Sequence, residues 1–415
     1  MPPILMAFDI VYQPVPTRTW HIGGDVAREP GLISRRMHSP LRQHRAAPAA
    51  RAVLLTSLVL AASCGPRKTA NNEIAIAVAL NPQRPGMQSI YNGVQLAVNE
   101  LNGQSRGKLG SARLIMLKGA PDVSDPVRIA DVFRQDARVV GVVGHPESGT
   151  TLAAIDEYAD AANGGKNGVV VISPTGTSPA LSGANRWLFR VCPSDVQSSR
   201  AVARYLLDSL GARRASVIYR NDSYGKDWAK SFAESYREGK GVVVQRDPYL
   251  QGATAWDAYA GYLKLLKPDA VLFPGSQEDA LLALRAMRAA GVDVPFIGGD
   301  ATSGLEANAD EFPGVRYTAF FLARRATSPE ARTFIAAYTA AFKEAPDQRA
   351  ALAYDAAMVI GRGVLEVGAN RADVRDYVES IGRERTAMAG AAGPIAFDAN
   401  HDAVNKPIVI ARVGR

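Results

Sequence analysis

The chain has 415 residues, of which 47% are hydrophobic and 21% are charged, and its formal net charge at pH 7 is +8. This composition is typical of a globular protein, and the length favours two domains or one large bilobed body. Residues 1–63 contain seven Arg and three acidic residues, so the remainder has 41 basic and 37 acidic residues and a net charge of +4. No basic run with interleaved aromatic residues follows, which argues against a nucleic-acid partner.

The sequence offers few residues for catalysis or metal binding. Cys64 and Cys192 are the only cysteines, and His145 and His401 are the only histidines after Cys64, which excludes a disulfide framework and argues against a His-based acid/base pair. The motifs GxSxG, HExxH, GxxxxGK[ST] and GxGxxG are absent. The acidic stretch 398–402 lacks the Gly and the closing Glu of a calcium loop. We therefore expect no enzyme activity, no metal and no cofactor.

The segment 37–63 has the parts of an export signal. Three Arg precede the apolar run 52–62, which is too short to span a bilayer, and small residues lead to Cys64. The segment resembles the lipobox of bacterial lipoproteins, except that Leu60 stands four rather than three residues before the cysteine. We expect a lipid anchor on Cys64, followed by a tether over 64–72. The alternative is an ordinary signal peptide with an incidental cysteine.

Residues 1–36 contain several Pro and show no amphipathic period. They are interpreted as a mis-annotated or disordered leader, so that translation would start at Met37.

From residue 74 onward, short aliphatic runs alternate with longer stretches of helical spacing. Such alternation predicts parallel sheets with crossover helices. The predicted strands are 74–80, 112–117, 139–144, 169–173, 215–219, 242–246, 270–273 and 295–298. Among the predicted helices, 89–102 and 278–290 each place apolar residues on one face. Residues 331–379 are expected to be mainly helical, and 395–413 to be strand-like.

Four predicted strands precede Pro193 and four follow it. This division predicts an α/β fold of two Rossmann-like lobes with parallel central sheets. Because helical residues and then strand-like residues follow the second series, the chain is expected to cross between the lobes more than once, which makes a hinge of several crossovers. The first lobe is expected to comprise 73–192 and 302–402, and the second lobe 193–301 and 403–415.

Two loops at predicted strand ends, 144–151 and 173–179, are rich in small hydroxyl residues. In open parallel sheets, ligands bind beyond the carboxyl ends of the strands, where helix N-termini present free N–H groups and a favourable dipole for anions. Each loop is therefore a candidate cradle for a carboxylate. The alternative is that the hydroxyl residues only cap helices and form turns.

Several short motifs occur in a fixed order along 74–414. They are Gly93 with Ala97, Glu100 and Asn102; Val142-Val143-Gly144 with Ser148 and Thr151; Ile172-Ser173-Pro174 with Thr177 and Pro179; Phe189-Arg190 with Asp195 and Gln197; Tyr224-Gly225; Pro268-Asp269-Ala270; Gly298 with Asp300; and Tyr354-Asp355-Ala356. In this order they resemble those of the periplasmic branched-chain amino-acid binding proteins and their wider family, the type I solute-binding receptors of ABC transporters.

The resemblance implies a type I periplasmic binding protein fold and a set of ligand-binding residues. The implied ligand-binding residues are Ser148, Thr151, Thr175, Gly176, Thr177, Tyr224 and Asp300. Ser148 and Thr175 with Thr177 would hold the ligand's carboxylate and amine, Tyr224 would be an aromatic of the second lobe, and Asp300 would pair with the ammonium. The alternatives are that Tyr224 only packs and that Asp300 only caps a helix. Glu147 is expected to face solvent, because it would repel a carboxylate.

The function implied is that of an extracytoplasmic protein, anchored at a membrane, which closes its lobes on a small polar ligand. The ligand would be an amino acid of the branched-chain type or a related compound, delivered to the permease subunits of an ABC importer. A sensory receptor of the same fold, or a binder of an amide, urea or aromatic acid, is the alternative.

Overall fold

The computed structural model describes residues 72–81, 86–105, 107–120 and 122–414. The predicted leader, signal peptide and lipidation site at Cys64 lie outside the described residues. Within the described ranges, no helix combines the length and the apolar character needed to cross a membrane.

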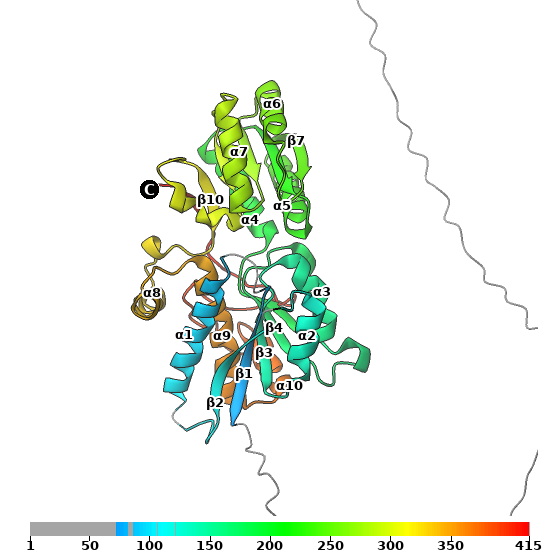
Figure 1. Cartoon of the computed structure of the whole chain (residues 1–415), viewed down its shortest axis with the longest axis vertical. Coiled ribbons are helices and arrows are strands. Elements are labelled where there is room, and N and C mark those ends of the chain that lie inside the picture. The colour runs from blue at the N-terminus through cyan, green and yellow to red at the C-terminus, as the bar shows by residue number, and fades with distance from the viewer. Residues whose placement is uncertain (1–71, 82–85, 106, 121, 415) are drawn as a thin grey trace, which may run out of the picture. The chain divides into compact units, whose positions relative to one another are not determined.

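The first lobe contains a five-stranded parallel sheet with the order β2-β1-β3-β4-β5 (Figure 1). Its strands are β1 (Glu73–Ala79), β2 (Arg113–Lys118), β3 (Val139–Gly144), β4 (Val170–Ser173) and β5 (Leu188–Arg190). Every residue of β3 is buried, as expected for a central strand that is covered on both faces.

Helices cover both faces of this sheet. They are α1 (Gln88–Gln104), α2 (Pro126–Gln135), α3 (Ser148–Tyr158), α9 (Gln348–Val367) and α10 (Arg371–Ser380), and α8 (Pro329–Phe342) packs on α1. Helices α2 and α3 pack side by side, and α9 packs on α1 and α10. A Cβ atom on Gly93 would lie 2.3 Å from the carbonyl oxygen of Ala350, so glycine allows α1 and α9 to approach closely. This contact holds a late segment of the chain in the first lobe.

The second lobe contains a six-stranded sheet with the order β11-β10-β9-β8-β6-β7. Its strands are β6 (Arg214–Arg220), β7 (Val242–Tyr249), β8 (Ala270–Phe273), β9 (Phe296–Gly298), β10 (Arg316–Ala319) and β11 (Val409–Arg412). All neighbours pair in parallel except β10 and β11, which are antiparallel.

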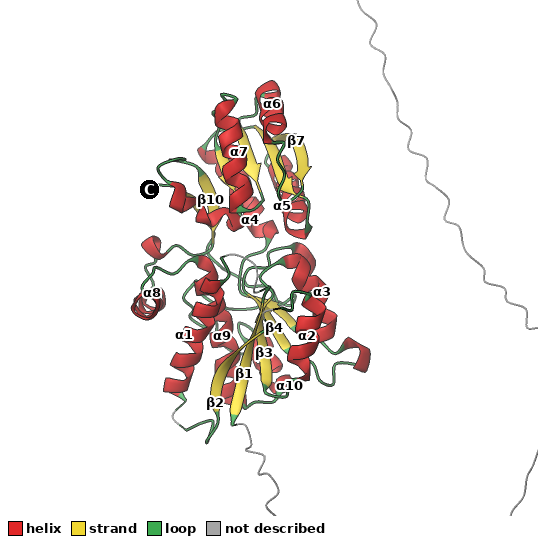
Figure 2. Ribbon diagram, in the orientation of Figure 1, coloured by secondary structure: helices red, strands yellow, loops and turns green. Residues whose placement is uncertain are grey.

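Separate hydrophobic clusters involve the helices of the second lobe. Its helices are α4 (Asp195–Arg204), α5 (Ser223–Glu238), α6 (Trp256–Leu266) and α7 (Gln277–Ala289), with a 3-10 segment, η4 (Asp300–Asn308). One cluster includes residues of α4 and α5, and the other includes residues of α6 and α7. Figure 2 shows strands between helices in both lobes, so the prediction of an α/β fold with parallel central sheets is confirmed.

The lobe boundary after residue 301 differs from the one expected. Strand β10 pairs with β9, so the chain stays in the second lobe until about residue 319 and returns to the first lobe only before α8. The sequence analysis missed β5 and β10 because neither is a purely aliphatic run: β5 ends in Arg190, and β10 begins with Arg316. The final strand β11 returns to the second lobe, so the chain crosses between the lobes three times.

Candidate ligand-binding site

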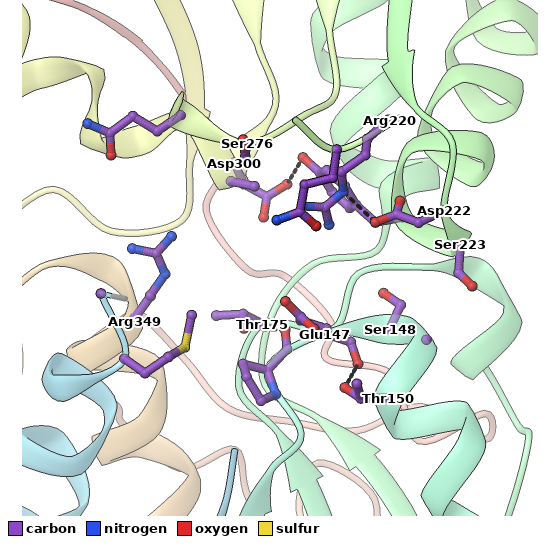
Figure 3. Close-up of a pocket in the computed structure, with 18 of the residues that line it drawn as sticks. Glu147, Ser148, Thr150, Thr175, Arg220, Asp222, Ser223, Ser276, Asp300 and Arg349 are labelled. Atoms are coloured by element: carbon purple, nitrogen blue, oxygen red, sulfur yellow. Dashed lines mark hydrogen bonds and ion pairs between the residues drawn. The ribbon is translucent and has the colours of Figure 1, made fainter. Parts of the chain in front are cut away.

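A cavity of about 410 Å³ lies between the two lobes, beyond the carboxyl ends of their strands. The first lobe contributes the loops after β3 and β4 and the N-termini of α1 and α9. The second lobe contributes the loops after β6, β7, β8 and β9. In Figure 3, Asp300 and Arg220 lie on one side of the cavity, and Ser148 and Thr175 lie on the other.

The first-lobe wall is centred on Ser148, the first residue of α3. Its Oγ accepts a hydrogen bond from the backbone N–H of Ser178 at 3.1 Å, which leaves the hydroxyl hydrogen for a ligand. The first helical hydrogen bond runs from the N–H of Thr151 to the carbonyl of Glu147 at 3.0 Å, so the N–H groups of 148–150 precede the helical ladder. This start of α3 can bind a carboxylate through a hydroxyl, peptide N–H groups and the helix dipole.

Thr175 also lines the cavity, and a hydrogen bond within the first lobe holds it in place. Its hydroxyl donates to the carbonyl of Pro146 at 2.6 Å, which joins the loop after β4 to the loop after β3. The two hydroxyl-rich loops predicted from the sequence therefore lie side by side.

Three predicted site residues lie behind this wall and not in the cavity lining. The Thr151 hydroxyl donates to the carbonyls of His145 and Glu147, and the Gly176 N–H donates to the hydroxyl of Ser173. Thr177 is fully buried, and its side chain lies beside the carboxylate of Asp195. In this conformation these residues support the wall and do not face the cavity.

The second-lobe wall brings Tyr224 and Asp300 together. The Tyr224 hydroxyl donates to Oδ1 of Asp300 at 3.0 Å, and both side chains line the cavity. Asp300 is only 5% exposed, and this burial raises the pKa of its carboxyl to about 6, although the Tyr224 bond opposes the shift. A Cβ on Gly299 would lie 2.2 Å from the Tyr224 hydroxyl oxygen, so glycine is needed there. A buried carboxylate of this kind can pair with an ammonium group.

Asp195 is a second buried acid near Asp300 that was not included among the predicted site residues. Its backbone N–H donates to the carbonyl of Thr177 at 2.8 Å, and its carboxylate lies beside the side chain of the same residue. Burial raises the pKa of Asp195, and the charge of Asp300 raises it further. Asp195 opens α4, directly after the first crossing between the lobes. No cluster of three or more His, Cys, Asp or Glu in the described ranges is arranged to hold a metal ion.

The cavity is also lined by charged residues that the sequence analysis did not assign to a site. Arg220 forms an ion pair with Asp222, and Arg349 lies 3.8 Å from a carboxylate oxygen of Asp347. Glu278 also lines the cavity, at the start of α7. No local pattern could have identified these residues, because they come from different elements that only the tertiary structure brings together.

The expectation that Glu147 faces solvent is wrong. Glu147 is partly buried and lines the cavity, and its Oε1 is inaccessible to solvent. The reason is the turn between β3 and α3, which makes Glu147 the N-cap residue of the helix that carries Ser148.

The two lobes touch beside the cavity. The Ser178 hydroxyl, from the first lobe, donates to the carboxylate of Asp227 on α5. Nearby, a Cβ on Gly149 would lie 3.4 Å from the hydroxyl oxygen of Ser223. The first turns of α3 and α5 thus lie close to each other.

The family model described as "Periplasmic binding protein" matches residues 82–415, so the chain belongs to the periplasmic binding protein family. The chain is 28% identical over 324 residues to the Leu/Ile/Val-binding protein BraC3 of Rhizobium johnstonii, which covers 76% of this chain and 84% of the relative. It is also 28% identical to Leu/Ile/Val-binding protein homolog 3 of Brucella melitensis, over 76% of this chain and 85% of the relative.

Solved structures agree with this assignment. The branched-chain amino acid transporter substrate binding protein LivJ of Streptococcus pneumoniae, in complex with isoleucine, is 26% identical with a TM-score of 0.71, and the match covers 81% of this chain and 95% of LivJ. The leucine binding protein LivK of Thermotoga maritima has the same fold, with a TM-score of 0.71 at 22% identity over 82% of this chain and 95% of LivK. The predicted family and fold are confirmed.

Proposed function

We propose that this protein is an extracytoplasmic receptor that captures an amino acid or a close relative by closure of its lobes and delivers it to an ABC importer. The observation that carries the proposal is the opposition, across one cavity, of the N-terminus of α3 with Ser148 and the buried carboxyl of Asp300. One wall suits an anion and the other suits a cation, which are the two ends of a zwitterion. The names of the relatives, which are Leu/Ile/Val-binding proteins, support an amino-acid ligand.

Binding would begin on the first-lobe wall. The ligand carboxylate would accept hydrogen bonds from the Ser148 hydroxyl and from the first N–H groups of α3. Hinge motion at the three crossings would then bring Tyr224 and Asp300 onto the ligand's ammonium. Because closure expels water, the local dielectric falls and each of these polar contacts strengthens. The closed form would be the one that the permease recognises.

The buried hydroxyl of Thr177 is a further candidate contact for the closed form. It is buried beside Asp195, at the first crossing between the lobes. The resemblance to the branched-chain amino-acid binding proteins assigns this hydroxyl to the ligand site, although it lies behind the cavity lining in this conformation. We propose that the loops carrying Thr175, Gly176 and Thr177 adjust on closure and bring the Thr177 hydroxyl to the ligand.

We further propose that Cys64 carries a lipid that holds the protein at a membrane surface. The export signal over 37–63 and the small residues before Cys64 support this. Mass spectrometry of the protein purified from membranes of the producing cell tests it. A mature N-terminus at Cys64 carrying a diacylglyceryl mass is expected, and an unmodified Cys64 would contradict the anchor.

A screen of the purified protein by thermal shift and calorimetry tests the binding function. Amino acids, their amides and small carboxylic acids would each be added in excess. A ligand at a hundred times its Kd stabilises the folded state by about 2.7 kcal/mol, which is readily detected as a higher Tm. We expect at least one free amino acid to bind, and the corresponding compounds without the amine or the carboxylate to bind much more weakly. Equal binding of those compounds would contradict the zwitterion site.

A further inference from the structure

A second cavity, of about 610 Å³, lies in the second lobe at the end of the sheet opposite the interlobe cavity. It is lined by the C-terminal half of α7, by residues 292–296 leading into β9, by residues 312–316 leading into β10, and by Arg412 at the end of β11. Because β9 and β10 are parallel, both present their amino ends there. The cavity is therefore separate from the site proposed for the amino acid.

The second cavity is positively charged. Three arginines line it, Arg288, Arg316 and Arg412, against one carboxylate, that of the exposed Asp293, which leaves a net charge of +2. The carboxylate of Glu311 is close to Arg288, but Arg285 occupies both of its oxygens at 2.7 and 2.8 Å. Within the described part of the chain, Arg316 and Arg412 form no ion pair. Their charge is therefore not cancelled by the protein.

Arg316 and Arg412 lie side by side. They are directly opposite in the antiparallel pair of β10 and β11, so their side chains share one face of the sheet. Nη1 of Arg316 donates to the carbonyl of Gly314 at 3.4 Å, and a Cβ atom on Gly314 would lie 2.9 Å from Nη2 of Arg412. The two guanidinium groups thus meet at this glycine. Like charges in opposite positions destabilise a sheet, and an anion placed between them would turn this repulsion into attraction.

The hydrogen bonds of the three guanidinium groups go to neutral partners and leave donors for a ligand. Arg412 makes no side-chain hydrogen bond to a described residue. Arg316 donates from Nε to the Tyr205 hydroxyl at 2.8 Å, and Arg288 donates from Nη2 to the carbonyl of Glu311. Neutral acceptors fix the direction of a guanidinium group without neutralising it. The arrangement therefore suits an anion with several oxygens, which guanidinium groups bind through paired hydrogen bonds.

Apolar side chains line the cavity beside the arginines. They are buried and belong to a hydrophobic cluster of the second lobe: Leu284, Met287, Phe296 and Phe312. The guanidinium of Arg288 lies 4.6 Å from the centre of the Phe312 ring, so the charged and apolar parts of the lining are in contact. A ligand with an apolar body next to its charge would gain from burying that body here.

We propose that this cavity binds a small organic dianion of the phosphate-monoester type, with its oxygens at Arg316 and Arg412 and its apolar body against the end of α7. A dianion matches the net charge of the cavity, and a phosphate accepts hydrogen bonds from more than one guanidinium group at once. The receptor then has a second binding site, at the far end of the lobe that closes over the amino acid.

Calorimetry on the purified full-length protein, in a phosphate-free buffer, tests the site with two probes, phenyl phosphate and inorganic phosphate. We expect both to bind. Phenyl phosphate is expected to bind at least about threefold more tightly, or roughly 0.65 kcal/mol, because its ring reaches the apolar lining. Equal affinities would overturn the role of that lining, and absence of binding by both probes would overturn the site.

Arg412→Gln assigns the binding to this cavity, and Arg246→Gln is the matched control. Arg246 is exposed on β7, the other edge strand of the same sheet, and lies outside the described linings of both cavities. Arg412→Gln is expected to weaken the binding of phenyl phosphate at least about tenfold, or about 1.4 kcal/mol, and Arg246→Gln to leave it unchanged. Wild-type affinity in Arg412→Gln, or an equal loss in the two variants, would overturn the proposal.

The head group of a lipid can carry the same phosphate monoester, and co-sedimentation with vesicles separates the two sources. A cavity of this volume accommodates a small molecule, so we expect no more protein on vesicles of phosphatidylcholine with phosphatidate than on vesicles of phosphatidylcholine alone. Additional retention by phosphatidate that is lost in Arg412→Gln and kept in Arg246→Gln would overturn the assignment to a soluble ligand.

Discussion

The two walls of the cavity are built differently, although each follows the strand ends of a parallel sheet. The first-lobe wall presents one helix start to the cavity, with the Ser148 hydroxyl and peptide N–H groups, and internal bonds such as Thr175 to Pro146 hold its loops in place. The second-lobe wall carries three of the four lining carboxylates: Asp222, Glu278 and Asp300. The difference suggests a division of labour in which the first lobe holds a group common to all amino acids and the second lobe discriminates between ligands.

The largest expected loss of ligand affinity comes from a substitution in the second-lobe wall. Asp300→Ala would leave the ligand's ammonium without a partner in a closed cavity, at a cost of about 2–4 kcal/mol, or roughly 30-fold to 1000-fold in Kd. Titration calorimetry with the best ligand of the screen measures it. Asp310→Ala is the control, because Asp310 is exposed and lies outside the cavity lining. Wild-type affinity in Asp300→Ala would show that the charge of Asp300 does not contribute to ligand binding.

Asp300 is also expected to make ligand affinity depend on pH. The pKa of Asp300 is raised to about 6 by burial, so its carboxyl is ionised above that pH and neutral below it. Affinity for an ammonium ligand is therefore expected to fall about tenfold for each pH unit below about 6. Stability of the ligand-free protein changes in the opposite sense: between about pH 4 and pH 6 the folded state binds more protons than the unfolded state, so this group's contribution declines as pH rises.

Calorimetry across this pH range, with Asp300→Asn beside the wild type, checks the assignment. The steep loss of affinity on acidification should disappear in Asp300→Asn. An unchanged slope in the variant would assign the titration to another group of the cavity.

A smaller loss of ligand affinity is expected from a substitution in the first-lobe wall. Ser148→Ala removes one hydroxyl donor to the ligand carboxylate and leaves the peptide N–H groups of α3 in place. The loss should be about 1.5 kcal/mol, or roughly tenfold in Kd, because a hydrogen bond to a charged group is stronger than one between neutral groups. Replacement of the ligand by its carboxamide provides the control: it should bind equally weakly to both proteins if Ser148 contacts that end.

The smallest effect on binding is expected behind the first wall. Thr151→Val removes the hydroxyl that donates to the carbonyls of His145 and Glu147, and it keeps the shape of the side chain. We expect a lower free energy of unfolding, by about 1 kcal/mol, with less than about a twofold change in Kd. Denaturant unfolding beside calorimetry separates the two quantities. A tenfold loss of affinity with unchanged stability would place Thr151 in the ligand site after all.

Most of the architecture could be predicted from the sequence, since alternating aliphatic runs and helical spacing depend on local order. The eight predicted strands all occur, and the helices predicted at 89–102 and 278–290 correspond to α1 and α7. The hydroxyl-rich loops after β3 and β4 could be found for the same reason: helix starts and strand ends leave a local signal. The two strands missed, β5 and β10, contain Arg190 and Arg316 and so lack the aliphatic run that marks the others.

The sequence by itself thus determined the two α/β lobes, the family resemblance and the hydroxyl-rich loop that carries Ser148. Only the tertiary structure decided which residues share the cavity. Glu147, Arg220, Glu278 and Arg349 come from four separate elements, and Thr177 lies behind the wall on which the sequence placed it. The physical reason is that strand and helix periods are set by neighbours along the chain, whereas the charge and polarity of a cleft depend on how two lobes meet across three crossings.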